Sequence, residues 1–202
     1  MTDVLSERVS SMLSKKRFDH VLGVVDMSVY LGKKCLPGKI SELKYAAFLH
    51  DITKELAYEE NIRLLGDEWN ELSDDEKNSH QILHSYTAPY YVKAHFAEYA
   101  TDDVLSAIRN HTVGSADMSI FDEIIFLADY IEEGREYKTC TLVRDFVKAS
   151  MSDDIDNNIM KLHEACIMAI DYTVQYLISH GLPIIQSTIM AKASLIRKIK
   201  QN

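Results

Sequence analysis

The adjacent residues His50 and Asp51 are the clearest chemical signal in the sequence. If this segment is a helix, Leu43, Ala46 and His50 share one apolar face, because residues three, four and seven apart lie on the same side. The imidazole then points toward the core, with a carboxylate beside it. Burying an unpaired carboxylate is costly, so a cation must lie close by. A divalent metal ion would satisfy both side chains, whereas the alternative is a hydrogen-bonded core histidine followed by a solvated aspartate.

Four more ionisable residues lie in apolar surroundings, spread along the chain: His20, His84, His111 and Asp129. His20 and His111 each share an expected helical face with aliphatic residues. Asp129 ends a segment that is apolar nearly all round, which indicates a buried helix. Each residue alone would more often be structural than a metal ligand. Core packing does not require so many ionisable groups, so the set as a whole favours a metal site.

The elements that must position these side chains are predicted to be helices. The chain has only 3 Pro and 7 Gly, and strand-like alternation is scarce. Helices are expected over about residues 2–14, 16–34, 42–56, 80–99, 102–114, 120–134, 141–150 and 156–180, with another from 187. Ser41 is the expected N-cap of the third helix, residues 70–79 are expected to form a loop, and Pro89 should kink or restart its helix. No repeat or linker is visible, which predicts one all-α domain over residues 1–202.

Composition limits the partners of this protein. The formal net charge is −9, so DNA, RNA and anionic membranes are unfavourable partners. The three cysteines, Cys35, Cys140 and Cys166, are too few and too far apart for a disulfide framework or a zinc motif. No signal-peptide pattern or membrane span is visible, so a cytoplasmic location is expected. A homodimer is compatible with the sequence, although no apolar stripe indicates one.

The order of these ionisable residues resembles the metal-ligand pattern of the HD superfamily of metal-dependent phosphohydrolases. Four local segments, residues 16–24, 48–55, 108–114 and 126–135, are similar to one branch of it, the YqeK-type symmetrical diadenosine tetraphosphate hydrolases. The resemblance spans about residues 10–185, which would be the core of the HD-type domain. It implies a helical bundle with two divalent ions, iron being the expected metal and manganese or magnesium the alternatives.

The same resemblance assigns roles to the ionisable residues. It matches the basic ligand set of the family to His20, His50, Asp51 and Asp129. It matches the ligands of the second metal to His84 and His111, with Asp51 bridging both metals. His80 is a second candidate for the position of His84.

The reaction that the resemblance implies is cleavage of diadenosine tetraphosphate into two ADP, by in-line attack of an activated water on phosphorus. Asp51 would act in catalysis with Lys54 and Arg135, two cations suited to binding phosphate. Thr112 and Gly114 would let the nucleotide approach the backbone closely. Without the resemblance, Lys54 and Arg135 would be surface cations and Thr112 and Gly114 would end a helix.

Three other interpretations stay open from the sequence. The first is another HD phosphohydrolase, a nucleotidase or a cyclic-nucleotide phosphodiesterase, because the metal ligands act on phosphorus and do not select the base. The second is a module that binds a nucleotide without cutting it, and the third is a helical interaction domain without a site. His163 is expected to be a core histidine, and no role follows from the sequence for Trp69 or Cys140.

Overall fold

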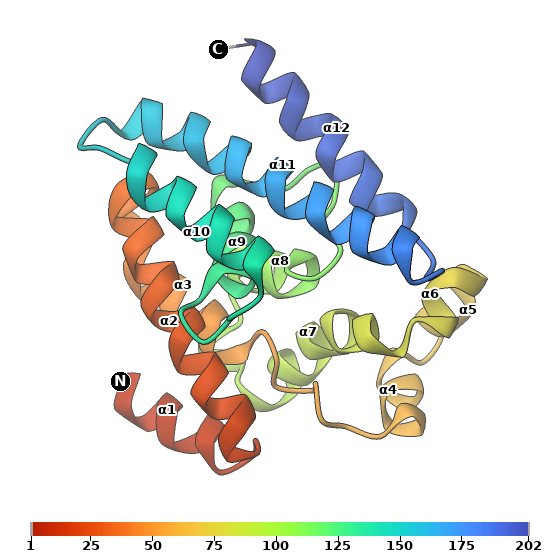
Figure 1. Ribbon diagram of the computed structural model, residues 1–202. Helices are drawn as coiled ribbons and strands as arrows, with labels where there is room; N and C mark the ends of the chain where they lie inside the picture. The colour runs from red at the N-terminus through yellow and green to blue at the C-terminus, as the bar shows by residue number, and fades with distance from the viewer. Residues whose placement is uncertain (1, 202) are drawn as a thin grey trace.

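The computed structural model describes residues 2–201, and these residues form helices and turns without any strand (Figure 1). The α-helices are α1 Thr2–Ser10, α2 Lys15–Cys35, α3 Ile40–Leu49, α4 Tyr58–Leu65, α5 Glu68–Glu71, α6 Asp74–Asn78, α7 Leu83–His95, α8 Asp102–Asn110, α9 Ile120–Ile131, α10 Lys138–Ser150, α11 Ile155–Ser179 and α12 Gln186–Gln201. Three 3₁₀ turns, η1 Pro37–Lys39, η2 His80–Ile82 and η3 Ala97–Tyr99, connect them. The predicted all-α class is confirmed. None of these helices is long and apolar enough to cross a bilayer.

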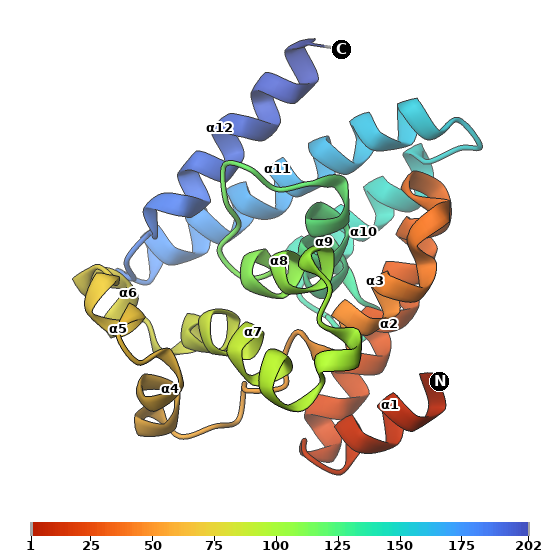
Figure 2. The ribbon, with the colours of Figure 1, turned by 180° about the vertical axis from the view of Figure 1, so that it is seen from behind.

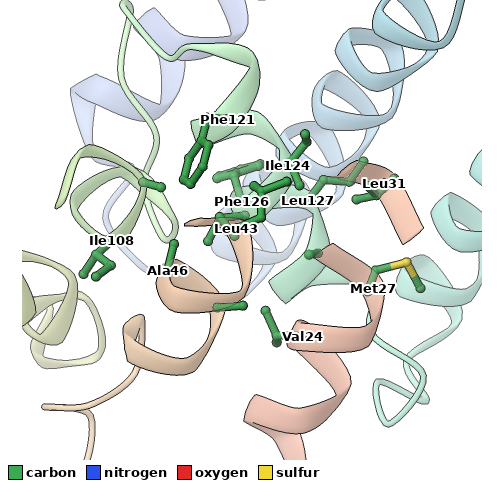
Figure 3. Close-up of a cluster of buried hydrophobic side chains, with 14 of the residues drawn as sticks. Val24, Met27, Leu31, Leu43, Ala46, Ile108, Phe121, Ile124, Phe126 and Leu127 are labelled. Carbon is green, nitrogen blue, oxygen red and sulfur yellow. The ribbon is translucent and has the colours of Figure 1, made fainter. Parts of the chain in front are cut away.

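Helix α9 lies at the centre of the fold, between α8 on one side and α10 and α11 on the other (Figure 2). Its side chains Phe121, Ile124 and Leu127 pack among residues of α2, α3 and α8, such as Leu43 and Ile108 (Figure 3). A helix that is apolar nearly all round reaches its lowest free energy when it is buried on every side. The sequence of α9 therefore forces the other helices to surround it. Asp129, near the end of the helix, is only partly buried, since its side chain is 19% exposed.

One charged residue of α9, Glu123, is fully buried. It lies near the start of the helix, whereas Asp129 lies near its end. Its carboxylate accepts a hydrogen bond from Lys198 Nζ of α12 at 2.7 Å and contacts His163 Nδ1 of α11 at 2.6 Å. A buried carboxylate is tolerated only when it is paired in this way. Glu123 therefore ties α9 to the two long helices behind it, and His163 is the core histidine that the sequence predicts.

Both predicted limits of the third helix, which is α3, are wrong. Ser41 is not the N-cap of α3, because the 3₁₀ turn η1 leads directly into the helix at Ile40 and Lys39 occupies the N-cap position. Helix α3 also ends at Leu49, well before residue 56. Consecutive turns follow it up to residue 56, and in one of them Thr53 Oγ1 donates a hydrogen bond to His84 O at 3.1 Å. His50 and Asp51 consequently lie just beyond the helix end.

Residues 70–79 are also not a loop. They include the end of α5 and all of α6, which begins with a capping box between Ser73 and Glu76. The spacing of these two residues is a sequence signal for a helix start. Helix α7 in turn continues through Pro89 and does not restart there, and it ends at His95 rather than near residue 99.

The start of α9 provides a test of this architecture. Replacing Ser119 by alanine should lower the free energy of unfolding by about 1 kcal/mol, because the side chain caps the helix. Ser119 Oγ accepts from Asp122 N at 3.2 Å and donates to Asp122 Oδ2 at 2.9 Å. Urea unfolding followed by circular dichroism measures the change. The control is Ser11→Ala, which removes an exposed hydroxyl that donates only to Arg8 O. An equal shift in both variants would contradict the capping role.

Candidate metal centre

Two histidines that follow helix ends are oriented by their own backbone. His50 Nδ1 donates to Ala47 O at 2.7 Å, and His111 Nδ1 donates to Ile108 O at 2.7 Å. A carbonyl oxygen can only accept, so each Nδ1 carries the proton and each Nε2 presents its lone pair. Both rings are almost fully buried. The turn after α3 and the turn after α8 therefore direct two ligand atoms to one point in the interior.

On one side of this point, His20 of α2 and Asp129 of α9 meet His50. His20 Nε2 is 3.0 Å from Asp129 Oδ1, and His50 Nε2 is 3.9 Å from the same oxygen. One donor atom from each of the three residues lies within 4.8 Å of the other two. This spacing is that of ligands that can surround one ion.

On the other side, His84 of α7 joins His111. Their Nε2 atoms are 2.9 Å apart, and they lie 3.1 Å and 3.8 Å from Asp51 Oδ1. The second oxygen of the same carboxylate, Asp51 Oδ2, is 3.6 Å from His20 Nε2 and 3.4 Å from His50 Nε2. Asp51 therefore faces both groups of histidines with different oxygens. His84, and not His80, is the histidine in this cluster.

One unpaired polar atom of the cluster fits a cation. The Nε2 atom of His50 is buried and has no hydrogen-bond partner among the described residues. Buried nitrogen atoms of this kind are rare unless something satisfies them. Four imidazoles and two carboxylates form a donor set that binds first-row divalent metals such as iron, manganese or zinc. These residues could therefore hold metal ions at the positions that the sequence predicts.

The pKa values of the cluster reflect the same crowding. Burial alone would raise the pKa of Asp51 and of Asp129, but the histidines around Asp51 and the Arg135 guanidinium beside Asp129 hold both pKa values well below the ordinary range. Burial lowers the pKa of His84 to about 3. For His20, burial is outweighed by the carboxylates of Asp129 and Glu132, which raise its pKa to about 9. The carboxylates are thus ionised, and His84 keeps a free lone pair.

Three cations surround the cluster. Arg135 Nη2 donates to Asp129 Oδ1 at 2.7 Å, and Arg17 Nη1 donates to Asp51 Oδ2 at 2.7 Å. Lys54 Nζ lies 3.3 Å from His84 Nε2 and donates to the backbone oxygen of Gln81 at 3.0 Å. Arg17 has no role in the site predicted from the sequence, although Arg17 precedes His20 by three residues and lies on the same face of α2.

Glu132 is a second residue that sequence analysis missed. Its Oε1 is 3.2 Å from His20 Nδ1, and its Oε2 accepts from Gly134 N at 2.5 Å. Gly23 of α2 lies directly against this carboxylate, because a Cβ there would overlap Glu132 Oε2. A carboxylate that accepts from the outer nitrogen of a ligand histidine fixes the ring and directs Nε2 inward. The pairing depends on contact between α2 and the end of α9, which no sequence spacing reveals.

Two cavities adjoin the cluster. The larger, about 560 Å³, is bordered by Asp129, Arg135 and Thr112, and also by Tyr130 and Cys140. The smaller, about 390 Å³, is bordered by Lys54, His84 and His80, and also by Tyr58 and Asn61. Both volumes are in the range of small-molecule sites.

The other residues singled out from the sequence lie at different distances from the cluster. Thr112 Oγ1 is 3.2 Å from His84 Nε2, so it belongs to the cluster edge. Gly114 has a φ of 71° and packs against Ala191, where a Cβ would meet the alanine Cβ at 3.0 Å. It ends the turn after α8 and does not border the larger cavity. Trp69 is half-buried and packs edge-on against Tyr58.

Known proteins resemble this chain over most of its length. The HD domain family model matches residues 17–134. A protein named symmetrical bis(5'-nucleosyl)-tetraphosphatase from Halalkalibacterium halodurans is 29% identical over 192 residues, which are 95% of each chain. One of the same name from Staphylococcus aureus is 30% identical and covers 88% of this chain and 85% of its own. A crystal structure of a predicted HD superfamily hydrolase involved in NAD metabolism from Clostridium acetobutylicum has a TM-score of 0.82 at 30% identity, with 98% of both chains covered.

Replacing Glu132 by glutamine should weaken Mn²⁺ binding about 10- to 100-fold, the range found when an outer partner of a ligand histidine is changed. A single amide oxygen cannot accept from both His20 Nδ1 and Gly134 N as the carboxylate does. Calorimetric titration of metal-free protein measures the affinity. Glu133→Gln is the matched control, because that neighbouring side chain is 63% exposed. Equal affinities of the two variants would rule out the orienting role of Glu132.

The affinity for Mn²⁺ should also depend on pH. Because the pKa of His20 is about 9 in the metal-free protein, the ring is protonated at neutral pH and the metal must displace that proton. Affinity should therefore rise by about tenfold per pH unit from about pH 7 and level off as pH passes the pKa of His20. Titrations in buffers of different ionisation enthalpy would detect the released proton. An affinity that does not change over this range would contradict the high pKa of His20.

Proposed function

The chain belongs to the HD domain family, and we propose that it hydrolyses diadenosine tetraphosphate symmetrically, into two molecules of ADP, with two divalent metal ions. It is an HD-type hydrolase, and the relatives reported above carry the name of this activity. The observation that supports the proposal most is the two-sided arrangement around Asp51. Each oxygen of this carboxylate faces its own pair of histidines.

The proposed ligands divide into two overlapping sets. The first metal would be held by His20, His50, Asp51 and Asp129. The second would be held by Asp51, His84 and His111. Iron is the metal we propose, because an imidazole-rich site favours iron over magnesium, which prefers oxygen ligands. Manganese is the alternative.

The residues of the chain prepare the reaction by binding and orientation. When divalent ions are bound at the cluster, they lower the pKa of water and offset the charge on phosphate oxygens. Arg135 presents a planar fork on the Asp129 side, and Lys54 presents an ammonium group on the His84 side. Arg17 is 28% exposed, so its guanidinium can extend toward a phosphate at the cluster. These three cations make a polyphosphate favourable in a protein whose net charge is −9.

The larger cavity suits a nucleoside attached to such a phosphate chain. It begins at Asp129 and Arg135 and extends along α11, where Tyr172 and Tyr176 border it. Tyrosine rings offer apolar faces for an adenine base, and their hydroxyl groups reach polar partners. Thr112 borders the same cavity beside His84. We assign one adenosine of the substrate to this cavity.

Product analysis of the metal-loaded protein tests the proposal. With Fe²⁺ under anaerobic conditions or with Mn²⁺, diadenosine tetraphosphate should give ADP as the sole nucleotide product. Formation of AMP together with ATP would mean unsymmetrical cleavage. Orthophosphate released from a nucleoside monophosphate, or opening of a cyclic nucleotide, in place of this reaction would identify another HD phosphohydrolase. Nucleotide binding without turnover by metal-replete protein would identify a binding module.

Replacing Asp51 by alanine should abolish both metal loading and hydrolysis, because this carboxylate would be shared by both ions. Elemental analysis and ADP release measure the two effects, and circular dichroism should report an unchanged helix content. Asp26→Ala, which removes an exposed carboxylate of α2, is the matched control and should retain both properties. An Asp51→Ala protein that turned over at the wild-type rate would overturn the mechanism.

A further inference from the structure

The smaller cavity has no part in the mechanism described so far. It lies on the His84 side of the cluster and is bordered by Lys54, Tyr58 and His80. Gln81 borders both cavities, so the two adjoin the same segment, residues 78–84, from different sides. The smaller cavity therefore begins at the metal cluster, as the larger one does.

Three aromatic rings, called the ladder below, contact one another in the order Trp69, Tyr58 and His80, and the last two border this cavity. Trp69 packs edge-on against Tyr58 with ring centroids 5.9 Å apart, and Tyr58 stacks on His80 at 4.1 Å with an angle of 22° between the rings. Trp69 and Tyr58 are half-buried, whereas His80 is exposed. A flat ring at the open end of such a stack is a surface on which a nucleobase can stack.

The ladder is held in place by several bonds to the surrounding helices. Tyr58 OH donates to Lys77 O at 3.5 Å, and Lys54 Nζ donates to Gln81 O at 3.0 Å. Tyr86 OH of α7 donates to Glu76 Oε1 at 2.8 Å and so ties α6 to the body of the protein. The stacking surface at His80 therefore exists before any ligand binds, which lowers the cost of ordering it.

Each side of the cluster thus has the same two components, a cation and a cavity. The Asp129 side has Arg135 and the cavity of about 560 Å³, and the His84 side has Lys54 and the cavity of about 390 Å³. A ligand with a nucleoside at each end of a phosphate chain would use both sides at once. A mononucleotide would use only one.

We propose that the smaller cavity binds the second nucleoside of a dinucleoside polyphosphate, with its base stacked on His80, and that this cavity selects dinucleotides over mononucleotides. The proposal rests on the proposed function and extends it to a specificity-determining residue. Lys54 binds the phosphate that leads into this cavity. Trp69 supports Tyr58 from behind and does not itself touch the ligand.

The test compares two substrates that share the cleaved bond, diadenosine tetraphosphate and adenosine 5′-tetraphosphate, which lacks one adenosine. In His80→Ala, the ratio of kcat/KM for the first substrate over the second should fall about tenfold, the effect expected for loss of one base stack. The change should lie in KM rather than kcat. His80→Phe should restore the ratio, since it keeps a flat ring. His95→Ala, which removes an exposed histidine packed on Tyr91 elsewhere on α7, should keep the wild-type ratio.

Binding of ADP to the metal-loaded protein separates this proposal from the proposed function. Wild-type protein should bind two ADP per chain, and His80→Ala should bind one at the same concentrations. If the protein does not cleave diadenosine tetraphosphate but this change in stoichiometry is seen, the proposed function fails and the second nucleoside site stands. If it cleaves the substrate and His80→Ala changes neither the ratio nor the stoichiometry, the second site is wrong.

Discussion

The placement of two carboxylates among four imidazoles is the constraint on which the rest of the structure depends: Asp51 is buried, and Asp129 is 19% exposed. Carboxylates without neighbouring positive charge are too costly to bury. Arg17 and Arg135 each pair with one of them, but the buried Nε2 atom of His50 still lacks a hydrogen-bond partner among the described residues. A cation bound at the cluster would satisfy this atom and the two carboxylates together.

The packing of the surrounding helices offsets the free-energy cost of bringing the charged side chains of the cluster together. Helix α9 brings Asp129 to the cluster because its other faces are apolar and must be covered by α2, α8 and α11. Glu123, on the same helix, is paired with Lys198 of α12 and His163 of α11. The helix that presents a metal-ligand candidate at one end is thus tied by a second buried carboxylate to the C-terminal helices.

Hydrogen bonds to the outer ring nitrogens fix the orientation of three histidine rings, which packing alone would not fix. The outer nitrogens of His50 and His111 are held by carbonyl oxygens three residues earlier, and that of His20 by Glu132. These bonds set the tautomers and turn the inner nitrogens toward Asp51. The cavities on the two sides of the cluster then decide which molecules reach it. In the proposed function the metal ligands would supply the chemistry, and Arg135, Lys54 and the aromatic side chains of the two cavities would select the substrate.

The sequence by itself determined the helical class, most of the helices and five of the six residues that meet at the centre, because each of these depends on local periodicity or on residue type. His20, His50, Asp51, His111 and Asp129 are recognisable from their apolar surroundings and from their order. The spacing of Ser73 and Glu76 is also a local signal, a capping box that predicts the start of α6. Only the tertiary structure decided that His84 rather than His80 joins the cluster, that Glu132 orients His20, that Arg17 pairs with Asp51 and that Gly114 serves a turn. These facts depend on contacts between helices distant in the chain, and such contacts leave no regular spacing in a single sequence.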